Sequence, residues 1–333
     1  MYCEEIKAIA HHDVGSLNIP GVYDHMMKCM ICGEAAVYHR QYSGEKLCED
    51  CFTQSIENKV RETIRQNRLM LHDERIAVAL SGGKDSSSLL RILVKLEKRF
   101  PRANLVAITV DEGIRGYREE SIKIAQKCCS DLEIKHEIVS FKDLYGYTLD
   151  EIVDVFRERE EGSAPCSYCG VLRRKALNKT GKALGADKIA TAHSLDDEVQ
   201  TILLNIIHGD VSRLSRATHV KENRRDGLIP RVKPFREVPE EEIALYAYLK
   251  GLELQQTPCP YTRESMRNDA RTMVNMAERR HPGTRFTILR SFEKLQASLH
   301  RVEYNTMYCK ECGEPSVSVL CKPCQILRDF KKM

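Results

Sequence analysis

The sequence predicts an α/β fold in which a doubly wound parallel sheet is flanked by N- and C-terminal zinc fingers. Three short, continuously apolar runs are typical of strands buried on both faces of a sheet, and they lie at 76–80, 105–110 and 188–192. Helical segments alternate with these runs, near 85–99, 118–130 and 194–208. This is the order of parallel strands joined by crossover helices. Paired cysteines near both ends of the chain predict the two fingers.

The composition is that of a soluble, mildly basic protein. The chain has 333 residues, enough for one large α/β domain with appendages, and a formal net charge of +4. This balance permits a nucleic-acid partner without requiring one. No apolar run approaches the roughly 18 residues of a membrane helix, and the N-terminus, MYCEEIKAIAHHD, lacks the layout of a signal peptide. We therefore expect a cytoplasmic protein with no membrane segment.

The first finger follows an N-terminal extension, residues 1–28, in which no motif indicates a role. The stretch KCMICGEAAVYHRQYSGEKLCEDCF holds two CxxC pairs joined through a hairpin-like YSGEK turn. Four thiolates from two such pairs surround one tetrahedral zinc ion. A structural zinc site is therefore predicted within 29–52, formed by Cys29, Cys32, Cys48 and Cys51. Apolar residues at near-helical spacing then predict a linker helix over 53–73.

Residues 75–86, RIAVALSGGKDS, join a predicted strand to a predicted helix through a glycine pair. Backbone N–H groups at such a helix N-terminus suit anionic oxygens, and the glycines let a ligand approach the backbone closely. Ser81, Lys84 and Ser86 add side-chain donors. The pattern is neither GxxxxGK(S/T) nor GxGxxG. The loop by itself therefore predicts phosphate binding without identifying the ligand.

Three further cysteines lie in loops rich in proline and glycine, which are poor places for core thiols. Cys166 and Cys169 form a lone CxxC pair in GSAPCSYCGVLRR, and Cys259 follows in QQTPCPYTRES. The pair fits half a zinc site, a redox dithiol or part of an iron–sulfur site. With Cys259, three thiolates fit a 4Fe-4S cluster with one open iron, or a persulfide relay that releases sulfur by thiol exchange. By contrast, Cys128 and Cys129 end an amphipathic helix, which predicts a packing role.

The C-terminal segment YCKECGEPSVSVLCKPCQILRDF repeats the zinc pattern with a shorter gap between its CxxC pairs. A second structural zinc site is predicted within 301–333, formed by Cys309, Cys312, Cys321 and Cys324. The remaining thiol, Cys3, belongs to no pattern.

The combination of these motifs resembles the tRNA 2-thiolation branch of the pyrophosphate-loop ATPases. The resemblance rests on SGGKDS, TVDEGIRG, TAHSLDDEVQT, the CxxC pair followed by GVLRR, the later cysteine after TP, and both fingers. It covers nearly all of 29–326. The first finger ends in CEDC rather than in a histidine, which is similar to the archaeal and eukaryotic cytoplasmic enzymes that act on the wobble uridine. Residues 1–28 depart from the family layout.

The resemblance implies an ATP-dependent sulfurtransferase with an ATP-binding and thiolation domain over 74–300. ATP, with magnesium, would adenylate the uridine with release of pyrophosphate, and sulfur would then displace AMP from the ring carbon. The implied catalytic residues are Cys166, Cys169, Cys259 and Asp197. Asp197 would contact ATP, its magnesium ion or the activated uridine, whereas Asp196 is expected only to cap its helix. The implied nucleotide-binding residues are Ala79, Ser81, Gly82, Gly83, Lys84, Asp85, Ser86, Asp111, Arg173 and Ala192.

A tRNA partner needs a basic surface, because phosphate contacts position the RNA backbone. One candidate stretch, 212–236, contains Arg213, Arg216, Lys221, Arg224, Arg225, Arg231, Lys233 and Arg236. A second group consists of Arg279, Arg280, His281 and Arg285. Either group fits a solvated loop equally well. The sulfur donor is open between free sulfide and a thiocarboxylated ubiquitin-like carrier, and relatives suggest a homodimer.

Other functions stay open at this point. The substrate could instead be the T-loop uridine or an anticodon-loop cytidine, although the cytidine enzymes typically carry a second CxxC where this chain has the single Cys259. An amide-forming ligase with the same loop would have no use for the three central cysteines. A non-catalytic zinc-finger RNA-binding subunit would be free to lose SGGKDS and HSLDDE, which are intact here.

Overall fold

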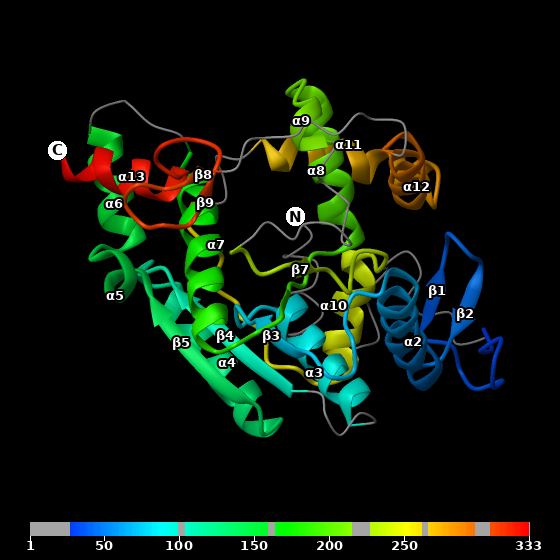
Figure 1. Cartoon of the computed structure of the whole chain (residues 1–333). Helices are drawn as coiled ribbons and strands as arrows, with labels where there is room; N and C mark the ends of the chain where they lie inside the picture. Colours follow the sequence, from blue (N-terminus) through cyan, green and yellow to red (C-terminus); the bar gives the residue numbers. More distant parts are fainter. Residues whose placement is uncertain are drawn as a thin grey trace.

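The computed structural model describes residues 27–98, 104–158, 164–214, 227–261, 266–296 and 307–332. Its centre is a five-stranded parallel sheet in the order β5-β4-β3-β6-β7 (Figure 1). The strands are β3 (Arg75–Ala79), β4 (Asn104–Asp111), β5 (Lys135–Ser140), β6 (Lys188–Ala190) and β7 (Arg231–Val232). The chain proceeds outward from β3 to β5 and then returns to the other side of β3 with β6. The predicted doubly wound sheet is confirmed, and its switch point lies between β3 and β6, where such folds bind ligands.

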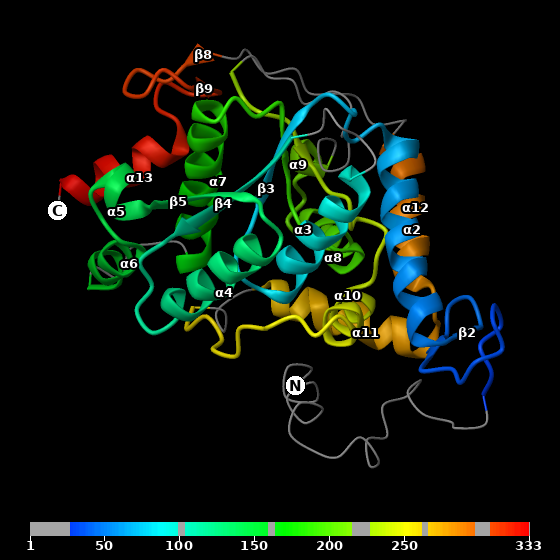
Figure 2. The ribbon, with the colours of Figure 1, turned by 90° about the horizontal axis from the view of Figure 1, so that it is seen from below.

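Both faces of the sheet are covered, because residues of each central strand alternate between two hydrophobic cores. In β3, Ile76 and Val78 belong to the first core and Ala77 to the second. The first core is completed by α3 (Lys84–Glu97), α4 (Arg118–Asp131) and α10 (Glu240–Leu249). The second is completed by α5 (Phe141–Tyr145), α6 (Leu149–Glu158) and α7 (Pro165–Ala183). Figure 2 shows the two groups of helices on opposite sides of the strands.

Three helices beyond β6 form a smaller third core. They are α8 (Leu195–Ile207), α11 (Arg267–Arg280) and α12 (Thr284–Gln296), which pack through Val199, Val274 and Phe292 among others. The four-residue α9 (Val211–Leu214) follows α8. Because α8 starts directly after β6, its N-terminus lies at the carboxyl edge of the sheet.

A small cysteine-containing unit lies at each end of the described chain (Figure 1). The first is the hairpin β1 (Tyr38–Arg40) and β2 (Glu45–Leu47), which leads into α2 (Glu49–Asn67); the second comprises β8 (Met307–Tyr308), β9 (Pro315–Ser316) and α13 (Lys322–Lys331). The hairpin at YSGEK is confirmed, whereas α2 starts and ends earlier than the helix predicted over 53–73. Among the described helices, none is long and apolar enough to cross a membrane.

Cys128 and Cys129 pack as predicted at the end of α4. Cys129 is 2% exposed within the first core, and Cys128 packs against that core. Burial raises the pKa of both thiols, that of Cys129 to about 12. Since the thiolate is the form that binds metals and attacks as a nucleophile, neither cysteine suits the sulfur chemistry.

Candidate active site

The SGGKDS loop lies at the carboxyl edge of β3 and ends in the first turn of α3. The Ser81 N–H donates to Ser86 Oγ over 3.1 Å, which closes the loop. Gly82 has a φ of +81°, and a Cβ atom there would lie 2.0 Å from the Ser121 carbonyl oxygen of α4. Glycine is therefore required by close packing as well as by conformation. Gly83 is the N-cap of α3, so the unpaired N–H groups of the first helical turn begin here.

Lys84 and Asp85 are the charged residues of the loop. Lys84 Nζ lies 3.1 Å from Asp85 Oδ2 and 2.8 Å from Glu240 Oε1 at the start of α10. Burial raises the pKa of Asp85 to about 6; Lys84 opposes this shift and Glu240 adds to it. Asp85 Oδ1 is buried with no hydrogen-bond partner among the described residues. An orphaned, buried carboxylate oxygen fits a bound cation, so this edge is suited to magnesium.

The N-terminus of α8 is capped by Ser194, and the expectation that Asp196 caps it is wrong. The Ser194 N–H donates to Asp197 Oδ2 over 3.1 Å and the Asp197 N–H donates to Ser194 Oγ over 3.3 Å, which forms a capping box. Asp196 instead accepts from the Glu240 N–H over 2.7 Å and pairs with Arg285 at 3.0 Å. It is 5% exposed, so its role is to tie α8 to α10 and α12.

Asp197 remains beside the nucleotide loop in spite of its capping role. Its Oδ1 lies 3.5 Å from Arg267 Nη1 of α11, and its negative charge contributes to the raised pKa of Asp85. The other residues predicted to contact the nucleotide, Ala79, Asp111 and Ala192, end or follow β3, β4 and β6. The structure thus places them at one edge of the sheet, while their contact with a nucleotide stays a prediction.

The three central cysteines come from two segments that lie against each other. Cys166 and Cys169 are in the first turns of α7, and Cys166 Sγ donates to the Tyr261 carbonyl over 3.4 Å. That contact holds the loop carrying Cys259 against the start of α7. Burial raises the pKa of Cys169 to about 11, and the thiols of Cys259 and Cys166 are near enough to add to the shift. The structure thus brings the segments of the three thiols close together, while their joint role stays a prediction.

This central group differs from a compact zinc site. In the part of the chain that the structure describes, the groups whose ligand atoms all lie within 4.8 Å of one another are the two terminal clusters, and neither includes a central cysteine. Thiolates around a four-iron cluster bind separate iron atoms, so they stand farther apart than the ligands of one zinc ion. Three thiols on two facing segments fit that wider arrangement.

The two terminal clusters do fit zinc. A Zn–S bond of about 2.3 Å places tetrahedral sulfurs about 3.8 Å apart, and the Sγ separations are 3.4 Å for Cys32 and Cys48 and 3.6 Å for Cys312 and Cys321. Burial acts to raise the pKa of the first cysteine in each cluster, Cys29 or Cys309. Neighbouring backbone N–H groups outweigh it and lower both values to about 6. These thiols are therefore ready to bind metal as thiolates.

A buried carboxylate that the sequence analysis passed over lies between the loop and the cysteines. Glu112 follows Asp111 in the TVDEGIRG motif and is 1% exposed. It forms ion pairs with Arg118 at 2.8 Å and with Arg173 at 2.5 Å. Arg173 was predicted to bind the nucleotide, but in the structure its guanidinium contacts the cysteine site. The signal that could have found Glu112 is its position beside Asp111 at a strand end.

Several basic residues of the two predicted RNA-binding stretches are engaged inside the protein. Lys233, Arg236 and Arg285 form ion pairs with carboxylates of other elements, and Arg231 donates to the Arg174 carbonyl over 3.0 Å. Arg236 and Arg285 are buried, so their interpretation as RNA-facing residues is wrong. The exposed residues are Arg213, Arg279, Arg280 and His281, whereas Arg216, Lys221, Arg224 and Arg225 lie outside the described residues.

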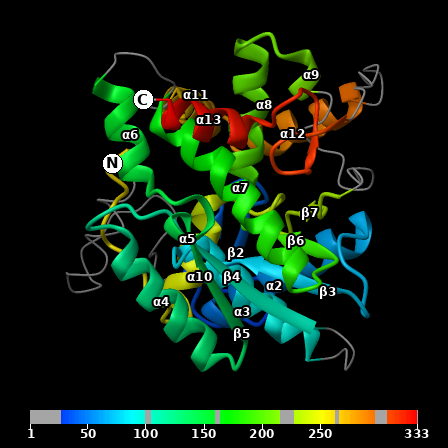
Figure 3. The same ribbon diagram turned by 60° about the vertical axis from the view of Figure 1, so that its left-hand side comes forward.

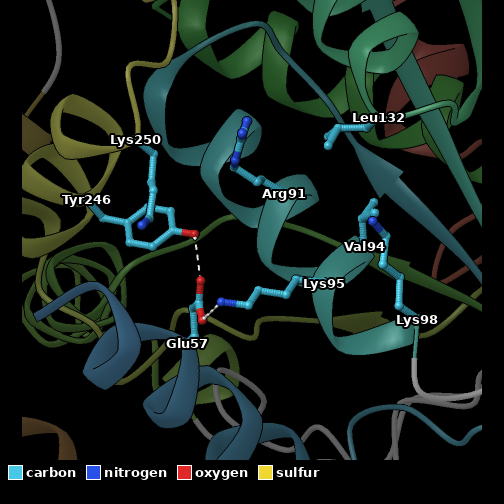
Figure 4. Close-up of a pocket in the computed structure, with 8 residues that line it drawn as sticks. All are labelled: Glu57, Arg91, Val94, Lys95, Lys98, Leu132, Tyr246 and Lys250. Carbon is cyan, nitrogen blue, oxygen red and sulfur yellow. Dashed lines mark hydrogen bonds and ion pairs between the residues drawn. The ribbon is translucent and has the colours of Figure 1, made fainter. Parts of the chain in front are cut away.

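A cavity of about 330 Å³ lies at the far end of α3 (Figure 4). Glu57 of α2 accepts from Tyr246 of α10 over 3.3 Å and pairs with Lys95 of α3 at 2.5 Å. Lys95 is about 16 Å along the helix from Lys84, at 1.5 Å per residue. The cavity thus lies where α2, α3 and α10 meet, and it is separate from the nucleotide loop.

The parallel sheet, the glycine loop at its switch point and the acidic start of α8 define a PP-loop ATP-binding protein. The PP-loop domain family matches residues 52–278, and the N-terminal LIM domain of 2-thiouridine synthetase TtuA matches residues 28–53. The chain is 39% identical to tRNA 2-thiolation protein NcsA from Haloferax volcanii over 323 residues, which are 92% of this chain and 99% of that protein.

Two further comparisons agree with this. Cytoplasmic tRNA 2-thiolation protein 1 from Oryza sativa subsp. japonica is 38% identical, over 90% of this chain and 82% of that protein. The structure of U34-tRNA thiolase NcsA from Methanococcus maripaludis with its 4Fe-4S cluster superimposes with a TM-score of 0.80 at 36% identity, covering 91% of this chain and 96% of that one. The chain therefore belongs to the tRNA 2-thiolation proteins of the PP-loop family, and the resemblance predicted from the sequence is confirmed.

Proposed function

We propose that the protein is an ATP-dependent tRNA sulfurtransferase that adenylates the wobble uridine and replaces its 2-oxygen by sulfur. One observation carries this proposal: the SGGKDS loop and the three central cysteines lie at the same edge of the sheet, joined through Glu112. The thiolase from Methanococcus maripaludis supports U34 as the modified position, and the name of the Oryza relative supports a cytoplasmic location.

The reaction has two steps that use different parts of this edge. The loop N–H groups bind the ATP phosphates while the uridine O2 attacks the α-phosphate and pyrophosphate leaves, and Lys84 offsets the developing negative charge. Asp85 and Asp197 would hold magnesium, which when bound adds positive charge for this step. Sulfide then attacks the ring carbon and AMP leaves, so the exchange needs no oxidant. Cys166, Cys169 and Cys259 would hold a 4Fe-4S cluster, which when bound supplies an open iron for a sulfur ligand.

The remaining assignments extend the same proposal. Residues 29–52 and 301–333 serve as zinc modules, 53–73 as the linker, which contains most of α2, and 74–300 as the ATP-binding and thiolation domain. The protein acts as a homodimer, which light scattering on the purified chain tests. The sulfur donor is sulfide or a thiocarboxylated ubiquitin-like carrier, and the two are distinguished by supplying each in turn to the reconstituted enzyme.

Reconstitution tests the function directly. Anaerobically purified protein, loaded with iron and sulfide, is incubated with magnesium, ATP and tRNA from a strain that lacks 2-thiolation. Nucleoside mass spectrometry with position mapping should detect 2-thiouridine at the wobble position, formed together with AMP and pyrophosphate. Asp85→Asn should abolish AMP formation, and Cys259→Ser should abolish iron binding. Iron-loaded protein that forms no thiolated nucleoside would overturn the proposal, whereas iron-free protein that still thiolates tRNA with sulfide would remove the cluster from it.

A further inference from the structure

Glu112 is a desolvated carboxylate that lies between the two halves of the proposed site. It follows the last residue of β4 and is 1% exposed. Each of its oxygens has its own cationic partner: Oε2 lies 2.8 Å from Arg118 Nε, and Oε1 lies 2.5 Å from Arg173 Nε. A carboxylate so far from water is stable only when it is paired. Here a single carboxylate joins two guanidinium groups that extend in different directions.

The first of these arginines is fixed at the nucleotide loop. Arg118 is 3% exposed, its Nη1 donates to the Ser81 carbonyl over 3.2 Å, and its Nη2 donates to the Val110 carbonyl over 2.6 Å. Two hydrogen bonds to backbone carbonyls and an ion pair with Glu112 thus hold one rigid, planar group, although the Arg118 Nε and Glu112 Oε2 atoms are not aligned for a hydrogen bond. The loop, the end of β4 and Glu112 therefore behave as one fixed unit.

The second arginine has more freedom and contacts the cysteine site. The Arg173 side chain is 45% exposed, and its Nη2 donates to Cys169 Sγ over 3.0 Å. Glu112 is the largest electrostatic influence on Arg173 and raises its pKa. A half-exposed side chain with many rotamers needs such an anchor to keep one hydrogen bond to a sulfur atom.

We propose that Glu112 is a positioning residue for sulfur transfer, holding the Arg173 guanidinium on the Cys169 sulfur and, through Arg118, in register with the nucleotide loop. This inference rests on the proposed function and deepens it. Hydrogen bonds to ligand sulfurs tune the potential of an iron–sulfur cluster, and partners behind the ligands set their orientation. Arginine suits this position because its fork reaches a carboxylate and a sulfur at once, which a single ammonium group does not.

A double-mutant cycle on the iron-loaded protein tests the proposal. Glu112→Gln and Arg173→Gln should each lower kcat for 2-thiouridine formation about tenfold or more, and the double variant should be no worse than Arg173→Gln alone. The KM for ATP should stay within about twofold, because Arg118 still holds Ser81. The cluster potential should shift in the same direction in both single variants. Additive losses, or a loss confined to the KM for ATP, would overturn the proposal.

Glu112→Gln leaves the buried Arg118 without its carboxylate partner and could fail to fold. Arg173→Lys gives the same test and keeps that ion pair. Lysine keeps the positive charge, so wild-type kcat and potential in this variant would contradict a bridging role. A crystal structure of Glu112→Gln is independent of catalysis: Arg173 should leave Cys169, and an unchanged contact would count against the inference. An inactive wild-type protein would refute the proposed function. The crystal structure of Glu112→Gln would still show whether Glu112 positions Arg173 on Cys169.

Discussion

The two terminal cysteine clusters have the same ligand set but attach to different halves of the proposed site. Each consists of two CxxC pairs whose first thiol has a pKa lowered to about 6. They lie on opposite sides of the molecule (Figures 1 and 2). The β1–β2 hairpin lies beside α2, and the C-terminal unit packs through its α13 against α7 and α6 (Figure 3). Since the metal chemistry is alike, any difference in their roles comes from what each cluster packs against.

The N-terminal cluster connects to the nucleotide loop through α10. Arg40 at the end of β1 pairs with Glu242 of α10 at 2.8 Å, and the two side chains are 4% and 0% exposed. Tyr42 also donates to Glu242 over 2.7 Å. Two residues earlier in the same helix, Glu240 pairs with Lys84 of the loop at 2.8 Å. A displacement of the hairpin would therefore be transmitted to Lys84, the side chain proposed to offset charge on the ATP phosphates.

The C-terminal cluster connects to the cysteine site through α7. Ile326 of α13 is 4% exposed in the same core as Cys169, and the ring of Phe330 packs 4.4 Å from that of Tyr147. Lys175, six residues after Cys169 in α7, places its Nζ 3.6 Å from Cys324 Sγ. Two like modules therefore support different halves of the proposed site: the N-terminal one contacts the nucleotide loop through α10, and the C-terminal one contacts the cysteine site through α7.

Loss of a ligand from the C-terminal cluster should have the largest effect. Cys321→Ser removes one zinc thiolate, and zinc contributes on the order of 10 kcal/mol to the folding of such small modules. Without it, α13 no longer holds α7, so we expect the iron content of the central site and the yield of 2-thiouridine to fall about tenfold or more. Iron and zinc per chain after anaerobic gel filtration, together with nucleoside analysis, measure this.

Cys48→Ser is the matched control in the N-terminal cluster. It should release one zinc ion per chain while leaving the central iron in place, because the contacts described for its hairpin lead to α2 and α10. Equal loss of iron in Cys321→Ser and Cys48→Ser would contradict the idea that each module supports a different half of the site.

Removal of the buried ion pair between Arg40 and Glu242 should have the next largest effect, on stability and on the KM for ATP. Arg40→Ala leaves Glu242 in the core with Lys59 at 3.5 Å and Tyr42, which should lower the free energy of unfolding by about 3–5 kcal/mol. The KM for ATP should rise, since α10 also holds Lys84. Urea denaturation and steady-state kinetics test both. Arg65→Ala, in the solvent-exposed pair with Glu62, should change neither quantity; a stability cost equal to that of Arg40→Ala would refute the argument.

Local pattern explains what the sequence could predict here, and distance along the chain explains what it could not. CxxC pairs, the glycine loop and the apolar runs of β3, β4 and β6 are short signals with one structural meaning. The edge strand β5, KHEIVS, is only half-buried and has no such signal. Asp196 and Arg285 seemed to be a helix cap and a surface charge, because their pairing joins residues from distant segments. Glu112 was passed over for the same reason, since its importance lies in Arg118 and Arg173.

A smaller effect is expected from the side chain that links α7 to the C-terminal zinc site. Lys175 is 10% exposed and contacts the sulfurs of Cys321 and Cys324. Lys175→Met keeps the aliphatic stem but removes charged hydrogen bonds worth about 1.5–3 kcal/mol. Zinc should leave this cluster faster when a chelator is added, while the N-terminal cluster in the same molecule serves as the internal control. Unchanged release from both clusters would remove Lys175 from the connection.

The smallest expected effect is a pH dependence of stability and ATP affinity that comes from Asp85. It tests whether Glu240 of α10 acts on the nucleotide loop. Its pKa in the fold is about 6, above the ordinary 3.8, because burial and the charge of Glu240 disfavour the carboxylate. The folded protein therefore binds more protons than the unfolded chain between these values, and the stability of the nucleotide-free protein falls as the pH rises from about 4 to 6. Binding of magnesium-ATP needs the ionised carboxylate, so its affinity should rise through the same range.

Glu240→Gln separates this electrostatic effect from a general loosening of the site. It removes one negative charge near Asp85 and leaves Lys84 to pair with Asp85 alone, so the midpoint of ATP affinity should move to lower pH, as measured by calorimetry across about pH 5 to 7. Lys175→Met, on the sulfur side, should leave the midpoint where it is. A midpoint that moves equally in both variants would mean that the two halves of the site are not supported separately. Glu240 on α10 is among the charges that act on Asp85, whereas loss of the Lys175 charge on α7 should not affect it.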